Sequence, residues 1–244
     1  ANDDRSLADL VRRCEQMQAA RGFRVRLQMD ATQAIAVISE IKRKSPSKGL
    51  LRADLDPQFL ADAYQAGGAS CLSVLTDEDF FAGSIEDLQI AAAACTLPVL
   101  RKDFTVSPHD VCDTRLMGAD CVLLIAATLD PHELKDLHHL ATSIGLDVLV
   151  EIHDEAELEV ALFAEALLIG VNQRDLVTFE VDHHRALRMA ELIPSGVLRV
   201  AESGVRGPAD ALALHQAGYH AVLVGESLVT ADDPTGAVRA LRNL

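Results

Sequence analysis

The chain has 244 residues, of which 49% are hydrophobic and 24% charged, and this composition excludes a disordered or low-complexity protein because it can build a sizeable core. Its 22 basic and 37 acidic side chains give a net charge of −15, which disfavours nucleic acids and anionic membranes as partners. No apolar run reaches the ~20 residues that span a bilayer, and residues 1–30 lack the order of a signal peptide. We therefore expect a cytoplasmic protein that needs a local positive site for any anionic substrate.

Neither the cysteines nor the histidines are spaced for a metal site. The cysteines are odd in number and no pair has C-x-x-C spacing, so we expect reduced, buried side chains without a catalytic role. The histidines include two adjacent pairs inside helical patterns, and no H-E-x-x-H motif is present. The cysteines are Cys14, Cys71, Cys95, Cys112 and Cys121.

Residues 1–30 stand outside the repeating pattern of the rest of the chain. The stretch SLADLVRRCEQMQAARGF (6–23) predicts one extra amphipathic helix, which we expect to lie across one mouth of the fold. No linker or composition change follows it. We therefore expect one domain over 1–244, with a helical extension over 1–30 and the main fold over 35–244.

From residue 36 onward, short runs rich in Val, Ile and Leu alternate with helical patterns. Each helical pattern carries apolar residues at i, i+3, i+4 and i+7, and several begin at a capping residue or an early proline. Apolar strands alternating with helices indicate a parallel sheet, and eight strands favour a closed (β/α)8 TIM barrel over an open sheet. The strands are expected at 36–41, 71–75, 99–104, 121–126, 147–152, 167–172, 198–204 and 221–227.

The ends of these strands are polar where their beginnings are apolar. In a barrel the C-terminal strand ends meet at one rim, which is where the functional residues of this fold lie. Acids and bases from several strands should therefore converge on one site. The candidates are Glu40, Lys42, Lys102, Asp103, Glu151, Asn172, Glu202 and Ser203.

Small residues follow the last two strands. ESGVR (202–206) and GESL (225–228) resemble turns whose glycines let backbone N–H groups approach an anion. Barrels often bind phosphate with these two loops. The turns at Ser203-Gly204 and Gly225-Glu226 therefore predict a phosphorylated substrate.

The first strand runs into a basic, proline-interrupted loop, ISEIKRKSPSKG (38–49). Lys42, Arg43, Lys44 and Lys48 form a local positive cluster in an otherwise acidic protein. One interpretation is a solvated loop. The other is a mobile flap that brings cations over a bound anion.

The strand ends, the two glycine turns and the 38–49 loop together resemble the indole-3-glycerol phosphate synthase family, whose members are enzymes of tryptophan biosynthesis. The motifs occur in family order over roughly residues 35 to 240, and E-I-K-x-x-S-P-S together with L-R-K-D-F is highly specific. The family fold is a (β/α)8 barrel, in agreement with the strand count. The matching motifs are EIKRKSPSKG (40–49), FFAGS (80–84), LPVLRKDF (97–104), GADCVLLIA (118–126), LVEIHDEAELE (149–159), IGVNQRDL (169–176), VAESGVRGPAD (200–210) and AVLVGESLV (221–229).

The resemblance implies a lyase that cyclises, decarboxylates and dehydrates 1-(2-carboxyphenylamino)-1-deoxyribulose 5-phosphate, with no cofactor and no metal. Lys102 matches the family's general acid and Glu151 its general base, while Lys42 matches a residue that binds substrate and assists the later acid step. Glu40 and Asn172 match positions that orient the lysines and the substrate hydroxyls. How the two lysines divide the acid steps stays open.

The resemblance also implies binding residues. Phe81, Phe104 and Leu123 match the apolar wall that contacts the anthranilate ring. Arg174 matches a residue near the substrate carboxylate, and Glu202 matches a polar residue at the floor of the site. The phosphate cradle is implied at Ser45, Ser203, Gly204, Gly225 and Glu226. We expect a monomer, and no partner enzyme is predicted.

Two alternatives remain open at this stage. Another phosphate-binding barrel enzyme, such as phosphoribosylanthranilate isomerase, would share the turns after the last two strands but would not need the 40–49 motif or the Lys102 and Glu151 pair. A non-catalytic paralogue would typically have lost one strand-end acid or base, and none is lost here.

Overall fold

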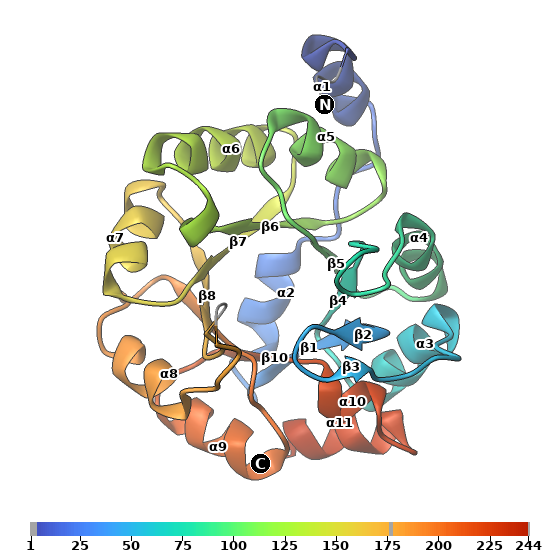
Figure 1. Ribbon diagram of the computed structural model, residues 1–244, viewed down its shortest axis with the longest axis vertical. Helices are drawn as coiled ribbons and strands as arrows, with labels where there is room; N and C mark the ends of the chain where they lie inside the picture. Colours follow the sequence, from blue (N-terminus) through green and yellow to red (C-terminus); the bar gives the residue numbers. More distant parts are fainter. Residues whose placement is uncertain (1–3, 176–177, 244) are drawn as a thin grey trace.

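The computed structural model describes residues 4–175 and 178–243, and in it eight parallel strands close into a barrel (Figure 1). The first strand pairs with both the second and the last strand of the barrel, which completes the ring and confirms the predicted (β/α)8 architecture. The strands are β1 (Ala36–Ile41), β4 (Cys71–Leu75), β5 (Val99–Lys102), β6 (Cys121–Ile125), β7 (Asp147–Ile152), β8 (Leu168–Asn172), β9 (Leu198–Glu202) and β10 (Ala221–Val224).

Helices surround the barrel and begin where the sequence provides caps. Asp56, Ser84 and Asp130, for example, each accept a hydrogen bond from backbone N–H groups of the first helical turn. Beyond two N-terminal helices, α1 and α2, the helices are α3 (Pro57–Gly67), α4 (Ile85–Ala94), α5 (Pro108–Leu116), α6 (Pro131–Ser143), α7 (Glu155–Phe163), α8 (His183–Ala190), α9 (Pro208–Gln216), α10 (Glu226–Val229) and α11 (Pro234–Arg242), with a short 3-10 turn at Ala126–Thr128.

Side-chain alternation along the strands divides the core into two layers. One set of residues packs against the helices, for example Val37, Val122 and Val150, which are fully buried. The alternate set, including Ile38 and Leu149, fills the inside of the barrel. Several inner positions near the C-terminal strand ends are polar, among them Glu40, Glu151 and Glu202, so the same alternation that packs the interior also directs functional groups into the mouth.

The N-terminal extension forms two helices, α1 (Leu7–Glu15) and α2 (Phe23–Asp30), where the sequence predicted one helix over 6–23. Residues 16–22 between them are not helical, and Gly22, which immediately precedes α2, takes a left-handed φ of +71° that a continuing helix would exclude. Figure 1 shows α1 on the outside of the ring beside α5, and α2 within the outline of the barrel.

The second helix, α2, closes the N-terminal end of the barrel. Phe23 and Leu27 are fully buried and belong to the inner core layer. Two strand beginnings hold the helix in place, since the backbone N–H of Arg24 donates to Asp147 at 2.9 Å and the Cys71 thiol contacts the Phe23 carbonyl at 3.7 Å. The helix predicted over 6–23 corresponds to α1, which lies outside the ring, so the prediction that it covers a mouth is wrong. The helix at the mouth is α2, which the sequence pattern did not predict.

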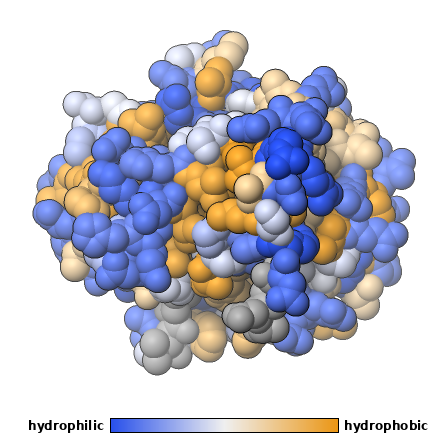
Figure 2. All heavy atoms as spheres, turned by 90° about the horizontal axis from the view of Figure 1, so that it is seen from above, coloured by the Kyte–Doolittle hydropathy of each residue, from blue (hydrophilic) through white to orange (hydrophobic). Residues whose placement is uncertain are grey.

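Hydrophilic side chains cover most of the face shown in Figure 2, with apolar groups between them. All five cysteines are free and buried, as predicted. Among the described residues, no helix is both long and apolar enough to span a membrane.

We expect Phe23→Ala to lower the free energy of unfolding by about 3–5 kcal/mol, because it empties a fully buried position at the floor of the barrel. Val25→Ala on the same helix is the matched control, since Val25 is 51% exposed and should change stability by less than about 0.5 kcal/mol. Urea denaturation of both variants measures the difference. Equal stability of the two variants would contradict a sealing role for α2.

Candidate active site

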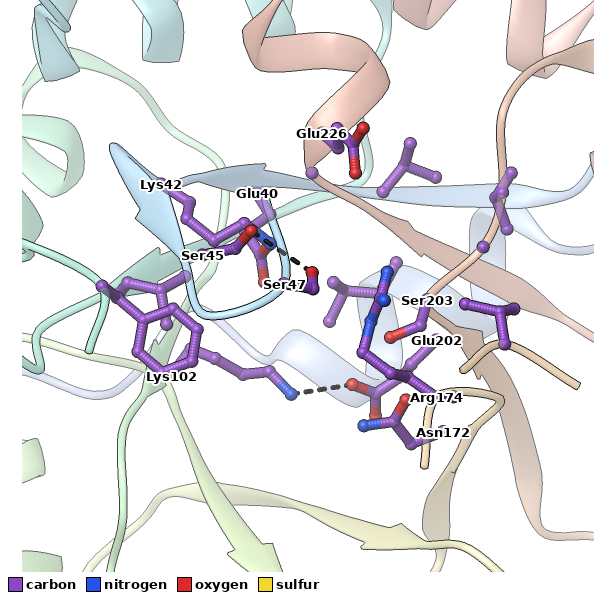
Figure 3. Close-up of a pocket in the computed structure, with 18 of the residues that line it drawn as sticks. Glu40, Lys42, Ser45, Ser47, Lys102, Asn172, Arg174, Glu202, Ser203 and Glu226 are labelled. Atoms are coloured by element: carbon purple, nitrogen blue, oxygen red, sulfur yellow. Dashed lines mark hydrogen bonds and ion pairs between the residues drawn. The ribbon is translucent and has the colours of Figure 1, made fainter. Parts of the chain in front are cut away.

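A cavity of about 650 Å³ lies at the C-terminal ends of the barrel strands, where the loops that follow them meet (Figure 3). Every site residue that the sequence predicts lines this cavity. They are Glu40, Lys42, Ser45, Phe81, Lys102, Phe104, Leu123, Glu151, Asn172, Arg174, Glu202, Ser203, Gly204, Gly225 and Glu226.

Lys102 is held between two carboxylates at the floor of the cavity. Its ammonium donates to Glu151 Oε2 at 2.6 Å and to Glu202 Oε2 at 2.8 Å. The three side chains come from β5, β7 and β9, which are alternate strands of the barrel. The side chains of Glu151 and Glu202 are only 3% and 2% exposed, so little water screens the interaction.

These buried charges shift one another's pKa. Burial alone would raise the pKa of Glu151, but the Lys102 charge and hydrogen bonds from Lys102 and Asn172 outweigh it and hold this pKa below its usual range. Burial raises the pKa of Glu202, and the nearby Glu151 charge raises it further. Burial opposes the charged form of Lys102, yet the two carboxylates keep its pKa above the ordinary value. The site therefore favours an ammonium, one ionised carboxylate and one carboxyl that keeps its proton to higher pH.

Gly170 on β8 makes room for Glu202. A Cβ at this position would overlap Glu202 Oε1. The same oxygen is buried and has no hydrogen-bond partner among the described residues. It is therefore a buried polar atom without a partner, next to the contact between Glu202 and Lys102.

A second pair of opposite charges forms at the end of β1. The Lys42 ammonium donates to Glu40 Oε1, and both side chains line the cavity (Figure 3). Gly225 at the end of β10 allows this pair to form, since a Cβ there would overlap Glu40 Oε1 and lie 3.1 Å from Lys42 Nζ. The sequence suggested that Gly225 approaches a phosphate; the structure gives it this additional neighbour.

Asn172 links the carboxylate cluster to the β8–α8 loop. Its amide donates to Glu151 Oε1 at 3.0 Å, and its carbonyl oxygen accepts from the backbone N–H of Arg174 at 3.0 Å. The Arg174 side chain donates to the Phe179 carbonyl at 2.8 Å. Asn172 thus orients Glu151, and the loop residue Arg174 is fixed above it.

An apolar wall faces the charged floor. Leu123 on β6 is 2% exposed at the base of the cavity, while Phe81 and Phe104 line it from the loops after β4 and β5. Phe80 packs edge-on against Phe104, with ring centroids 6.2 Å apart. This wall suits a flat aromatic ring beside the ionic cluster.

The two small-residue turns lie together on the opposite rim. Ser203 and Gly204, which directly follow β9, take positive φ values of 64° and 77°, and Gly225 precedes the short helix α10 that begins at Glu226. An added Cβ on Gly204 would lie 2.6 Å from Val181 Cγ1. Both turns line the cavity, as expected for a phosphate site formed by backbone N–H groups.

Only part of the basic cluster over 42–48 reaches the cavity. Its loop contains the antiparallel strands β2 (Lys44–Ser45) and β3 (Gly49–Leu50). Lys42 and Lys48 line the cavity, and Lys48 Nζ lies 3.7 Å from Glu226 Oε1. Arg43 instead pairs with the buried Asp87, and Lys44 donates to the Asp79 carbonyl at 3.2 Å.

Sequence reasoning missed several residues of the site. Phe179, Val181 and His183 line the cavity from the β8–α8 loop, and Arg206 lines it beyond Gly204. Only Arg206 belongs to a quoted motif, because the loop residues follow no strand end directly. Asp103, a strand-end candidate, lines the cavity, but its carboxylate accepts a hydrogen bond from Arg101 at 2.8 Å.

Comparison with known proteins identifies the family of this chain. The family model described as indole-3-glycerol phosphate synthase matches residues 1–241. A curated indole-3-glycerol phosphate synthase of Bordetella pertussis (strain Tohama I) is 48% identical over 235 residues, which cover 96% of this chain and 90% of that protein. The chain belongs to the indole-3-glycerol phosphate synthase family. It is accordingly a decarboxylating lyase of tryptophan biosynthesis.

Solved structures of lower identity share the barrel. A thiamine phosphate pyrophosphorylase from Pyrococcus furiosus aligns with a TM-score of 0.64 at 14% identity, covering 86% of this chain and 95% of that one. An N-acetylmannosamine-6-phosphate 2-epimerase from Clostridium perfringens aligns with a TM-score of 0.63 at 13% identity, covering 82% and 90%. These likenesses concern the fold alone.

The described residues of this indole-3-glycerol phosphate synthase family chain contain no group of three or more His, Cys, Asp or Glu side chains that could hold a metal ion. The acidic residues that meet in the cavity are instead paired with Lys102 and Lys42.

The pKa shifts predict opposite pH effects for Glu202→Gln and Glu151→Gln. The folded pKa of Glu202 is raised, so ionising this residue destabilises the protein as pH rises above its ordinary value of 4.5. Glu202→Gln should therefore gain stability relative to wild type from about pH 4.5 upward. The folded pKa of Glu151 is lowered from 4.5 to about 2, so the ionised form of this residue stabilises the folded protein. Glu151→Gln should therefore lose stability relative to wild type as pH rises from about 2 to 4.5, and the loss should stay constant above that pH.

Urea denaturation at a series of pH values between about 2 and 8 measures both effects. Below about pH 4.5 the difference in stability between Glu202→Gln and wild type should no longer change with pH, because the wild-type carboxyl is then protonated in both states. A Glu202→Gln variant that loses stability as pH rises would show that this carboxyl is held in the charged form.

Proposed function

We propose that this cavity converts 1-(2-carboxyphenylamino)-1-deoxyribulose 5-phosphate to indole-3-glycerol phosphate, with Lys102 as the general acid of ring closure and Glu151 as a general base. The family assignment supports the overall reaction. The division of roles rests on one observation above all, the contact of the Lys102 ammonium with two buried carboxylates beside an apolar wall.

Ring closure needs an acid at the ribulose carbonyl while the aromatic carbon attacks it. An ammonium stabilises the developing alkoxide and can donate a proton to it. Lys102 projects into the cavity from β5, on the same side as Leu123 of the apolar wall. A substrate oxygen at the ammonium would take the place of a carboxylate contact, and losing that contact would make Lys102 a stronger acid.

After carbon dioxide leaves, the second oxygen departs as water, which needs an acid for the leaving oxygen and a base for a ring proton. Glu151 suits the base because its lowered pKa keeps it ionised. Lys42 suits the second acid because it reaches the cavity from β1 and is held by Glu40. Asn172 and Glu40 then act as orienting residues.

Binding groups for the two ends of this substrate lie on opposite sides of the cavity. The turns at Ser203-Gly204 and Gly225-Glu226, with Ser45, suit the phosphate. Phe81, Phe104 and Leu123 suit the anthranilate ring, with Arg174 near its carboxylate. The Ser45 hydroxyl accepts from the Lys48 backbone N–H at 3.2 Å, so this residue also shapes its own loop. We also propose a cytoplasmic monomer that needs no metal or cofactor.

The alternatives raised by the sequence are less well supported. An isomerase acting on a related phosphorylated substrate would not require the paired lysines and carboxylates that meet here. A non-catalytic paralogue would not be expected to retain the strand-end acids and bases as ion pairs in one cavity.

Lys102→Ala should lower kcat by at least ~10²-fold, because it removes a positioned acid, with a much smaller change in KM. Lys102→Arg should be similarly slow, since a guanidinium keeps the ion pairs but does not give up a proton. The control is Lys135→Ala on α6, because Lys135 does not line the cavity and pairs with Glu165 instead. Fluorescence of the indole product measures turnover, and a Lys102→Arg rate near wild type would remove the acid role.

Gly204→Ala should raise KM about 10-fold or more, which corresponds to about 1.4 kcal/mol. The alanine would have to adopt a φ of +77° and press against Val181, which would deform the proposed phosphate turn. Glu226→Ser should change KM by less than about 5-fold, the scale of an exposed charge, because only its backbone N–H faces the phosphate. A large effect of Glu226→Ser with a tolerated Gly204→Ala would place the phosphate elsewhere.

A further inference from the structure

His153 directly follows β7 and lies between two carboxylates, those of Glu151 and Glu157. Its Nδ1 is 3.0 Å from Glu157 Oε2, and its Nε2 is 3.6 Å from Glu151 Oε1. The imidazole is buried, with 11% of the side chain exposed, and Nε2 has no hydrogen-bond partner among the described residues. Glu151 itself lines the cavity, whereas His153 and Glu157 do not.

Local structure explains how the three groups align. Residues 151 and 153 are two positions apart at the end of β7, so their side chains leave the strand on the same side. Asp154 then caps α7 by accepting from the Glu157 backbone N–H at 2.9 Å. That turn brings the Glu157 carboxylate back to the His153 backbone N–H, at 2.7 Å, and to its ring.

The proposed base Glu151 has a proton to dispose of after each turnover. Its side chain is 3% exposed, and substrate or product fills the cavity side during the reaction. Glu157 is more accessible, with 19% of its side chain exposed. His153 lies between the two, whereas Lys102 and Asn172, which also contact Glu151, line the cavity itself.

We propose that Glu151, His153 and Glu157 form a proton relay that returns Glu151 to its ionised form between turnovers. The inference rests on the proposed role of Glu151 as base. The protonated Glu151 gives its proton to His153 Nε2 while the His153 Nδ1 proton passes to Glu157 Oε2, and Glu157 releases it to water. The imidazole ends with the same number of protons, and no other reactant is consumed.

The charges around His153 favour this exchange. Burial would lower its pKa, but the hydrogen bond to Glu157 and the charges of Glu151, Glu157 and Glu202 outweigh burial and raise it. When Glu151 takes up a proton, one of these negative charges disappears, so the imidazole becomes more ready to pass its Nδ1 proton to Glu157. The 3.6 Å gap at Nε2 is longer than a hydrogen bond, and such catalytic contacts often tighten only with substrate bound.

A purely structural role would account for only part of this geometry. Glu157 satisfies the His153 backbone N–H, as helix-start carboxylates commonly do. That contact does not require an imidazole and does not explain an unpartnered buried Nε2 directed at the cavity's carboxylate. His153 is therefore a positioning and relay residue rather than a group that touches substrate.

The test is the turnover of His153→Ala on the proposed substrate, with and without added imidazole. The relay predicts a fall in kcat of at least about 10-fold, smaller than removal of the acid or base itself, with KM within about 3-fold of wild type. Added imidazole should restore part of kcat in this variant but not in wild type. Glu157→Gln should also lower kcat, whereas Glu159→Gln on the same helix, an exposed side chain, is the matched control.

Each result decides between the relay and a structural role. A His153→Ala kcat within 2-fold of wild type overturns the relay. A slow His153→Ala that imidazole does not rescue, together with a Glu157→Gln that matches Glu159→Gln, also overturns it and leaves a packing role. Should His153→Ala fail to fold, His153→Gln and Glu157→Gln carry the test through the kcat-against-KM comparison. Absence of indole product with wild-type enzyme would instead refute the proposed function.

Discussion

A single buried ammonium between two carboxylates is the constraint on which the rest of this site depends. Lys102 meets Glu151 and Glu202 although they lie 49 and 100 positions away in the chain. Leaving any one of these charges unpaired in so dry a place would cost several kcal/mol. The barrel supplies the geometry, because closure of the sheet brings the ends of β5, β7 and β9 to one rim at fixed spacing.

The charged groups fit because neighbouring positions carry no side chain. Gly170 leaves room for Glu202, and Gly225 leaves room for the Glu40–Lys42 pair. Each of these glycines sits on or beside a strand adjacent to the one that bears the charge. The positions of the charged side chains around the mouth therefore depend on these two glycines as well as on the charged residues themselves.

Much of this arrangement could be predicted from the sequence. Apolar strands at regular intervals indicated the barrel, and polar strand ends such as Lys102 and Glu151 indicated which side chains would meet, since strand order and side-chain alternation follow simple rules. The ion pairs that these side chains form, and the protonation state of each carboxyl, could not be predicted in the same way, because both depend on three-dimensional distances and on burial. Arg43 is an example. Its charge suggested that it could contact a bound anion, but its guanidinium pairs with Asp87, which is distant in sequence, and Arg43 does not line the cavity. The position of α2 likewise depends on tertiary contacts of Phe23 that no local pattern encodes.

The floor formed by α2 has a consequence for the order of events at the site. Phe23 and Leu27 seal the N-terminal end of the barrel, so the cavity is a blind chamber that opens only toward the loops in the described part of the chain. In the proposed reaction, carbon dioxide, water and the indole product all depart by the passage that admitted the substrate. The indole product must therefore leave the cavity before the next substrate molecule can bind.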